Sequence, residues 1–264
     1  MSTQYNNIQG PYDYMRTQSI ALIESENVQD TLKPFIRDAK VLELACGSGH
    51  YTYDFLKWGA KSVVGVDISS VMIEEARRRG KALGDPAKSV DFILSDCGKP
   101  TSYKGGPFDV VFGAWLLNYA PDHAALVEMF RNIALNLKDG GHFVGVTLPG
   151  AQDPLAFLES EKKLRPPPLG SGLLYYNFIN RVEDGIFFNA HADTQVGVVD
   201  FDCYHLRKDI YDSAAKEGGL QSIHWDITRV PERYLKGEGS GGASLEELKS
   251  YREVPNYGVV TVIK

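Results

Sequence analysis

Short apolar runs alternate with segments of helical periodicity over residues 40–148 of the chain. The apolar runs predict buried strands, which we place at Val41–Ala45, Ser62–Val66, Val90–Leu94, Phe108–Phe112 and His142–Leu148. The segments between them predict helices, which we place at His50–Trp58, Ser70–Ala82 and Pro121–Leu137. This alternation is typical of an α/β domain with a parallel sheet and helices on both faces.

The alternation stops after Pro149. Residues 150–195 contain three consecutive prolines, several glycines and a group of aromatic side chains, so we predict an insertion there rather than another strand–helix unit. Regular structure is expected again later, with strands at Gly197–Tyr204, Ser222–Arg229 and Gly258–Ile263 and a helix at Arg207–Lys216. Residues 14–36, ahead of the first strand, are predicted to be helical.

The composition is that of an ordinary globular protein, with 264 residues, 43% of them hydrophobic and 23% charged. The formal net charge of −6 argues against nucleic acid as the main partner. Three widely spaced cysteines without a C-x-x-C pair argue against a disulfide framework or a zinc site, and we expect no bound metal. The polar N-terminus and the lack of an apolar run of about 20 residues predict a cytoplasmic protein that does not associate with membranes.

The segment Glu43-Leu-Ala-Cys-Gly-Ser-Gly49 places an apolar strand directly before a turn rich in small residues. Gly47 and Gly49 allow the backbone to bend sharply and to approach a ligand closely. Ligands of open α/β sheets bind in the crevice beyond the strand ends, so this turn is a candidate site. Further acids follow the next two strands, and the first of them, Asp67, can accept hydrogen bonds from both hydroxyls of a ribose; the second is Asp96.

The dinucleotide fingerprint G-x-G-x-x-G/A does not fit this turn, because Thr52 occupies the third position counted from Gly47. The spacing E-x-A-x-G-x-G resembles instead the first motif of class I methyltransferases that use S-adenosylmethionine (SAM), usually written D/E-x-G-x-G-x-G. Ala45 replaces the first glycine. The resemblance covers residues 40–148 and, more loosely, 200–263. It implies a Rossmann-like fold with a seven-stranded, mostly parallel sheet, an antiparallel last strand and SAM as the cofactor.

The resemblance also implies a domain organisation. Residues 1–264 would form one methyltransferase domain, with an N-terminal helical cap (1–39), a SAM-binding core (40–148), a substrate-lid insertion (149–198) and the C-terminal part of the sheet (199–264). The stretch from Tyr5 through Tyr12 and Asp13 resembles a segment that folds over the cofactor in members acting on small molecules. Over the whole family motif set, the implied cofactor-binding residues are Tyr12, Glu43, Ala45, Cys46, Gly47, Gly49, Asp67, Ile68, Met72, Asp96, Cys97, Gly113, Ala114 and Trp115.

The resemblance assigns a part of SAM to most of these residues. Glu43 and the turn would face the methionine, and Asp67 would hold the ribose. Ile68 and Met72 would flank the adenine, and Asp96 would bind its amino group, with Cys97 beside it. The backbone from Gly113 would line the side of the sulfonium.

The acceptor is less defined by the sequence. After the fourth strand the chain reads Gly113-Ala-Trp-Leu-Leu-Asn-Tyr119, without the N/D-P-P-Y/F motif of enzymes that methylate base amines. With the acidic charge, this predicts a small aromatic or apolar metabolite of cofactor or secondary metabolism, methylated at O, N, C or S, and no nucleic acid. The candidate acceptor contacts are Tyr119, Tyr175 and Tyr176, and the candidates for a base or substrate contact are His191 and His205. We expect a monomer or a homodimer.

Two other functions are compatible with parts of the sequence. A short-chain NAD(P)-dependent oxidoreductase requires Tyr-x-x-x-Lys, which Tyr204 and Lys208 satisfy, although late in the chain and without a matching glycine turn. A protein of the SAM fold that binds SAM without transferring its methyl group would carry the same cofactor motifs.

Overall fold

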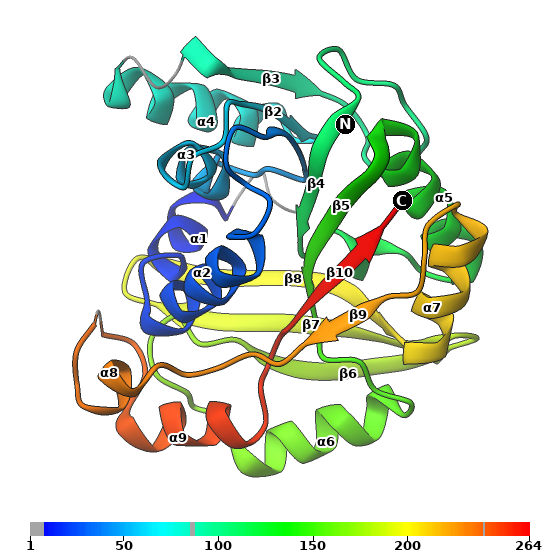
Figure 1. Ribbon diagram of the computed structural model, residues 1–264. Helices are drawn as coiled ribbons and strands as arrows, with labels where there is room; N and C mark the ends of the chain where they lie inside the picture. The colour runs from blue at the N-terminus through cyan, green and yellow to red at the C-terminus, as the bar shows by residue number, and fades with distance from the viewer. Residues whose placement is uncertain (1–7, 85–87, 240) are drawn as a thin grey trace.

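A seven-stranded sheet forms the centre of the protein, seen here in a computed structural model that describes residues 8–84, 88–239 and 241–264 (Figure 1). The strand order is β3-β2-β1-β4-β5-β10-β9. The strands are β1 (Lys40–Leu44), β2 (Ser62–Asp67), β3 (Val90–Leu94), β4 (Phe108–Ala114), β5 (Leu137–Thr147), β9 (His224–Asp226) and β10 (Gly258–Ile263). β1 to β5 are parallel, and β10 runs antiparallel to both of its neighbours. The predicted Rossmann-like fold with an antiparallel last strand is confirmed.

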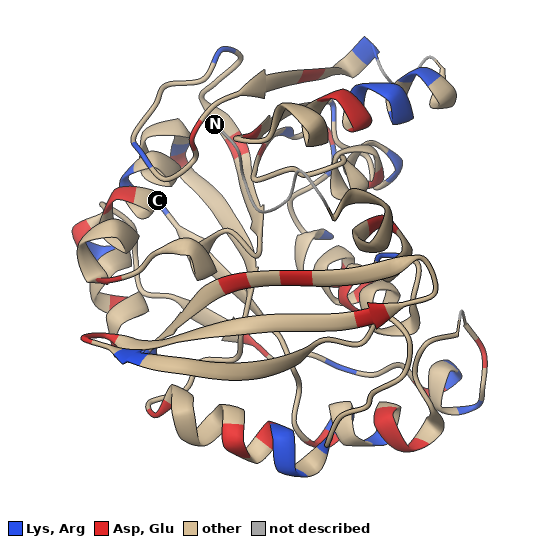
Figure 2. Ribbon diagram, turned by 180° about the vertical axis from the view of Figure 1, so that it is seen from behind, with Lys and Arg blue, Asp and Glu red and all other residues tan. Residues whose placement is uncertain are grey.

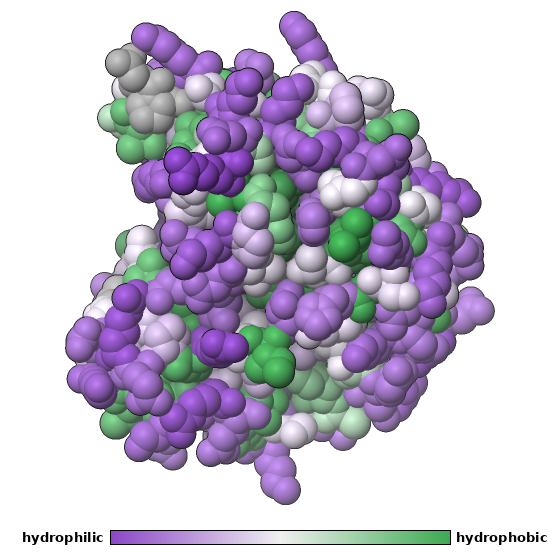
Figure 3. Space-filling view, in the orientation of Figure 1, coloured by the Kyte–Doolittle hydropathy of each residue, from purple (hydrophilic) through white to green (hydrophobic). Residues whose placement is uncertain are grey.

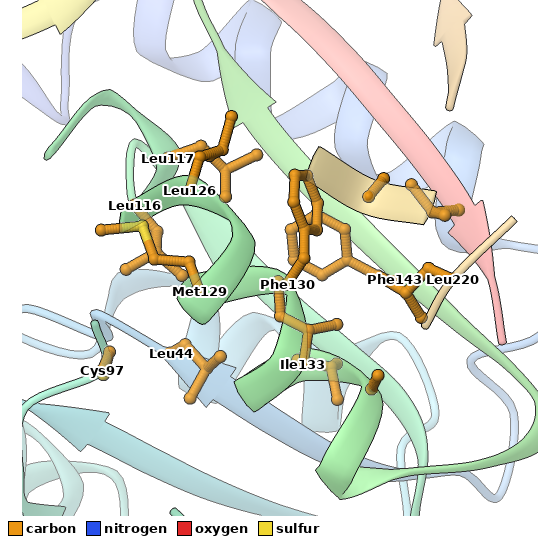
Figure 4. Packing of buried hydrophobic residues seen from close by; sticks show 14 of the residues in the cluster. Leu44, Cys97, Leu116, Leu117, Leu126, Met129, Phe130, Ile133, Phe143 and Leu220 are labelled. Carbon is orange, nitrogen blue, oxygen red and sulfur yellow. The ribbon is translucent and has the colours of Figure 1, made fainter. Parts of the chain in front are cut away.

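Helices cover both faces of this sheet, because its central strands are apolar on both sides. On β4, Val110 and Phe112 pack with one set of helices, whereas Val111 packs with the other. The first set is α2 (Ser19–Leu32) and α3 (His50–Lys57), with α4 (Ser70–Leu83) beside β2 and β3; the second is α5 (His123–Asn136) and α7 (Lys208–Glu217). Figure 4 shows Phe130 and Ile133 of α5 against Phe143 of β5. The surface seen in Figure 3 is mostly hydrophilic, with hydrophobic side chains in small separate areas.

A second, three-stranded antiparallel sheet lies across the carboxyl ends of β4 and β5 (Figure 1). Its strands are β6 (Tyr175–Val182), β7 (Gly185–Thr194) and β8 (Gly197–Leu206). Ile186, Phe188 and Ala190 of β7 pack inward, against Leu148 after β5 and against α6 (Pro154–Leu164). The other face of this small sheet is open. Figure 2 shows it in front of the large sheet, with acidic residues on β7 and β8.

The small sheet differs from the sequence-based expectation in two ways. Residues 150–195 hold α6 and two strands, although the sequence suggested an irregular insertion. The strand expected at Gly197–Tyr204 was assigned to the main sheet, whereas β8 pairs with β7 along its whole length. Buried and partly exposed residues alternate on β7, but hydrophobic and polar residues do not. The partly exposed positions hold Phe187, Asn189 and His191, of which the first is hydrophobic. The division of the chain at residues 149–198 stays a prediction.

The remaining elements lie around the two sheets. They are α1 (Gln9–Met15), the 3-10 helix η3 (Leu117–Tyr119), α8 (Glu232–Leu235) and α9 (Leu245–Glu253). Among the helices in the described ranges, none has the length and hydrophobicity needed to span a membrane.

Gly80 is required where α4 crosses α3. The Tyr53 hydroxyl on α3 donates to the Ala76 carbonyl oxygen at 2.8 Å, and a Cβ on Gly80 would lie 2.2 Å from the same hydroxyl oxygen. We expect Gly80→Ala to lower the free energy of unfolding, because overpacking costs about 1–3 kcal/mol. That exceeds the helix-propensity gain of at most about 1 kcal/mol. Urea unfolding measures the difference.

Gly10 on α1 provides the matched control for this substitution. A Cβ at Gly10 would meet nothing within 4 Å, so Gly10→Ala should lose no stability. An equal loss in both variants would contradict the packing explanation.

Candidate cofactor and acceptor sites

The turn after β1 has a backbone that favours small residues. Ala45, Gly47 and Gly49 have φ values of 57°, 53° and 77°. Ala45 is unusual there, because a side chain in the left-handed region costs roughly 1–2 kcal/mol. A Cβ on Gly49 would lie 3.1 Å from the Ala76 Cβ, whereas a Cβ on Gly47 would meet nothing within 4 Å. Gly49 therefore allows α3 and α4 to pack, and Gly47 leaves open space beside the turn.

Asp67, at the end of β2, ties this turn to the start of α4. Its carboxylate accepts hydrogen bonds from the Gly47 and Ser69 backbone N–H groups, each at 2.8 Å. The residue is only 8% exposed. Burial raises the pKa of its carboxyl group, against the effect of these backbone hydrogen bonds. The arrangement fixes both carboxylate oxygens at the carboxyl edge of the sheet.

Glu43 lies inside β1, directly beneath the turn. It is 3% exposed, and the Thr52 hydroxyl of α3 donates to its carboxylate. Burial raises the pKa of Glu43 to about 8; the Thr52 hydrogen bond opposes this, and the negative charge of Asp67 adds to it. A positively charged ligand bound beside this carboxyl group would lower its pKa and favour its ionised form.

Asp13 of α1 contacts the turn from above. Its carboxylate accepts from the Ser48 hydroxyl at 2.7 Å and pairs with His50 Nε2 at 2.9 Å and Arg79 at 3.2 Å. Burial acts to raise the pKa of Asp13, but the hydrogen bonds from His50 and Ser48 outweigh it and lower the pKa. Asp13 was predicted only because its segment resembles one that folds over the cofactor. Tyr5, in the same segment, lies outside the described residues.

A second polar cluster, which was not predicted from the sequence, has Glu24 of α2 at its centre. Glu24 is 3% exposed and accepts from Arg16 at 2.8 Å, from the Tyr51 hydroxyl at 2.7 Å and from Trp115 Nε1 at 3.1 Å. Trp115, which follows β4, has a φ of 60° and donates its backbone N–H to Val146. Strained backbone of this kind is concentrated at functional sites. No spacing in the sequence connects these residues, which come from four separate segments.

The other predicted cofactor residues occupy neighbouring positions. Cys46 is buried under the turn, and its backbone N–H donates to Val66. Asp96 is half-buried and accepts from the Gly98 N–H at 2.8 Å. Cys97 is buried against the Val66 carbonyl, and burial raises its pKa to about 12.

Ile68 is exposed, whereas Met72 is 2% exposed inside α4. Gly113 and Ala114 end β4. Tyr12 is half-buried on α1. The structure therefore brings the turn, Asp67 and Trp115 to one edge of the sheet, with Asp96 and Cys97 after the adjacent strand β3. The cofactor contacts themselves stay predictions.

An aromatic cavity lies between this edge and the small sheet. The void space in it and at its open mouth totals about 280 Å³, with room for about one water molecule, and its surface is almost wholly apolar. The lining residues come from η3, the ends of β4 and β5, and the inner face of the small sheet: Trp115, Asn118, Tyr119, Leu148, Leu174, Tyr176, Phe188, Ala190, Phe201 and Cys203. Tyr119 and Tyr176 were predicted acceptor contacts, and the structure brings them together here. Phe188, Phe201 and Cys203 were not predicted, although the aromatic content of the insertion pointed to this region.

The structure does not bring the two candidate histidines to this cavity. His191 lies on the open face of β7, where Nδ1 is 2.7 Å from Asp200 and the ring packs on Tyr175 at 5.0 Å. His205 is 1% exposed, and its Nε2 lies 3.1 Å from the Pro149 carbonyl oxygen. Burial lowers the pKa of His205 to about 4, so its ring is neutral at neutral pH. A role for either as a base stays a prediction. Over the described ranges, no group of three or more His, Cys, Asp and Glu side chains could hold a metal.

Comparisons with known proteins define the class of this domain. Residues 41–141 match a protein-family model described as a methyltransferase domain. The chain is 37% identical over 128 residues to an mRNA cap guanine-N(7) methyltransferase of Caenorhabditis elegans, covering 44% of this chain and 33% of that protein. It is 31% identical over 153 residues to the mRNA cap guanine-N(7) methyltransferase of Saccharomyces cerevisiae, covering 53% and 34%. The solved structure of the CcbJ methyltransferase from Streptomyces caelestis superposes with a TM-score of 0.63 at 16% identity, over 99% of this chain and 98% of that one.

Residues 41–141 thus match a methyltransferase domain, and the fold is shared with methyltransferases of known structure, one of them solved with SAM bound, which supports SAM as the predicted cofactor. The chain spans about a third of the length of the two curated relatives. Their names state that they act on mRNA caps, which contradicts the prediction of a small-molecule partner without nucleic acid. That prediction was wrong because a whole-chain net charge does not describe how charge is arranged around a binding site.

Proposed function

We propose that this domain transfers the methyl group of SAM to a planar aromatic or apolar acceptor bound at the aromatic cavity, which widens to admit it. The observation that supports this most is the position of Trp115. Its backbone belongs to the predicted cofactor set, and its indole lines the cavity, so the two sites share a wall. Open space beside Gly47 and two acids at the strand ends are compatible with a donor that carries positive charge.

The chain's own residues would act mainly by holding and aligning the reactants. SAM supplies a methyl group bound to a sulfonium. The sulfur is an excellent leaving group, because it departs as a neutral thioether. Asp67 would hold the ribose, Glu43 and the turn would face the methionine, and the rings around Trp115 would orient the acceptor and exclude water. Alignment and exclusion of water can supply much of the rate enhancement of such an in-line displacement.

A second candidate acceptor is the guanine of an RNA cap, which the two curated relatives favour. Guanine is also planar, so the cavity alone does not distinguish it from an aromatic metabolite. Incubation with labelled SAM and either a dinucleotide cap analogue or a panel of aromatic phenols and amines would separate the two. Label in the cap analogue alone would support the cap, label in the panel would support a metabolite, and label in neither would contradict both candidates.

Ala190 offers a way to test the cavity without touching the proposed cofactor residues. It is 1% exposed and lines the cavity from β7. We expect Ala190→Leu to fill part of the cavity and to raise the KM for the acceptor about fivefold, corresponding to about 1 kcal/mol. The dissociation constant of S-adenosylhomocysteine, measured by calorimetry, should not change. An unchanged KM would place the acceptor elsewhere, and Val198→Leu on the exposed surface of β8 serves as the control.

A further inference from the structure

Trp115 forms the wall between the proposed donor and acceptor sites, and two hydrogen bonds hold it. Its backbone N–H donates to the Val146 carbonyl oxygen at 2.7 Å, and its φ of 60° is unusual for a bulky residue. Its half-buried side chain packs with the core cluster of α2 and α3 and also with the cluster under the small sheet. The same side chain lines the aromatic cavity. The orientation of this one ring therefore affects the shape of the acceptor site.

The second hydrogen bond fixes the orientation of the indole. Nε1 of Trp115 donates to Oε2 of Glu24 on α2 at 3.1 Å. Rotation of an aromatic ring about its last side-chain bond has broad, roughly two-fold preferences, so packing against apolar neighbours does not by itself select one orientation. An indole has a single polar atom, and only one of the two orientations brings it to Glu24. The hydrogen bond therefore selects the orientation that the cavity wall adopts.

Glu24 divides its two carboxylate oxygens between different partners. Oε1 accepts from Arg16 at 2.8 Å and from the Tyr51 hydroxyl at 2.7 Å, whereas Oε2 accepts from Trp115. The Arg16 and Glu24 side chains are 7% and 4% exposed. A buried arginine needs a charged partner, and Oε1 provides it. Pairing with Arg16 therefore does not explain why Oε2 meets the indole.

We propose that Glu24 is a positioning residue for the acceptor, because it fixes the indole of Trp115 in the orientation that aligns a flat acceptor with the donor. Hydrogen bonds to an ionised carboxylate are stronger than those between neutral groups. The aromatic cavity has room for about one water molecule, so an acceptor must displace part of the lining. The ring held by Glu24 stays in place while other lining residues move. The inference rests on the proposed function, because it needs an acceptor at this cavity.

Glu24→Gln tests this role with little change in the shape of the side chain. Its amide has one oxygen and one NH2 group, whereas Arg16 and the indole nitrogen can only donate. If the amide oxygen stays with Arg16, the NH2 group faces the indole and two donors meet. The Trp115 ring should then lose its single orientation.

Fluorine NMR of the full chain labelled with 5-fluorotryptophan measures the orientation of the ring. The chain has three tryptophans, and the Trp115 resonance is identified by its absence from Trp115→Phe. In Glu24→Gln this resonance should shift or split into two. The resonance of Trp225, which packs on Tyr211 of α7, should not change. An unchanged Trp115 resonance in Glu24→Gln would refute the proposal.

Transfer of labelled methyl groups measures the consequence for the acceptor. With the acceptor that the cap analogue or the aromatic panel identifies, Glu24→Gln should lower kcat about tenfold, because a small misplacement of one reactant slows an aligned displacement steeply. The dissociation constant of S-adenosylhomocysteine, measured by calorimetry, should not change. Weaker binding of S-adenosylhomocysteine with an unchanged kcat would assign Glu24 to the donor and overturn the proposal.

Glu161→Gln is the matched control. Glu161 is also buried, at 5% exposed, and it pairs with Arg165 at 2.8 Å on α6. This variant should lose stability through its broken ion pair but keep the Trp115 resonance and kcat. An equal loss of kcat in both variants would refute a specific role for Glu24. If the wild type labels no acceptor, the proposed function fails, whereas a normal kcat in Glu24→Gln refutes only the positioning role.

Discussion

Replacing Asp67 with alanine is expected to weaken the binding of S-adenosylhomocysteine by more than tenfold. The substitution would remove the two proposed hydrogen bonds between the ribose hydroxyls and the charged carboxylate, each worth roughly 1.5–3 kcal/mol. The same carboxylate holds the Gly47 and Ser69 N–H groups, so the turn would also lose its present geometry. Calorimetric titration of the purified variant measures the change.

Two variants control for a general effect of removing charge or size at this position. Asp67→Asn keeps one carbonyl oxygen and the volume of the side chain, so its affinity should lie between those of the wild type and the alanine variant. Asp91→Ala removes an exposed carboxylate from the neighbouring strand β3 and should bind normally. Normal affinity in Asp67→Ala would exclude Asp67 from the ribose site.

The second large effect concerns the stability of the ligand-free protein against pH. Glu43 has a pKa of about 8 in the folded state, above its ordinary value of 4.5. The folded state therefore keeps a proton that the unfolded chain releases. The contribution of this bound proton to the free energy of unfolding is complete below pH 4.5, decreases as the pH rises and is lost by about pH 8. The shift corresponds to about 5 kcal/mol between these limits.

Glu43→Gln isolates this contribution, because glutamine is neutral at every pH and can still accept from Thr52. The difference in unfolding free energy between the variant and the wild type should be small near pH 4.5 and should grow in favour of the variant up to pH 8. Urea unfolding at several pH values measures it. A difference that does not depend on pH would mean that Glu43 is ionised in the folded protein.

Much of the fold was accessible from the sequence because the strands of the large sheet are short and apolar, with turn residues between them. β3 and β10 were placed with their observed ends, Val90–Leu94 and Gly258–Ile263. The small sheet was not recognised, because its residues are buried only on the side that meets η3 and α6. Which face of the small sheet is buried depends on where the strand ends of the large sheet lie. No local sequence pattern contains this information.

The cofactor edge was predictable for a similar reason. The turn follows β1 directly and Asp67 is the last residue of β2, and the ends of neighbouring parallel strands always meet. Glu24 and the acceptor cavity could not be predicted, because their parts come from segments far apart in the chain. Glu24, for example, meets Trp115 across 91 positions of sequence. His191 and His205 show the converse error. They were predicted to lie near the acceptor because of their residue type and position in the chain, and neither lies at the cavity.

Glu24 has a consequence for how the two reactants influence each other. The carboxylate is held at once by Arg16 after α1, by Tyr51 on α3 and by the indole that forms part of the acceptor wall. Because these contacts connect the N-terminal helices to Trp115, we expect binding of the donor to change the affinity for the acceptor. If bound donor raises the affinity for the acceptor by some factor, bound acceptor must raise the affinity for the donor by the same factor. The total free energy of forming the ternary complex is therefore the same for either order of binding.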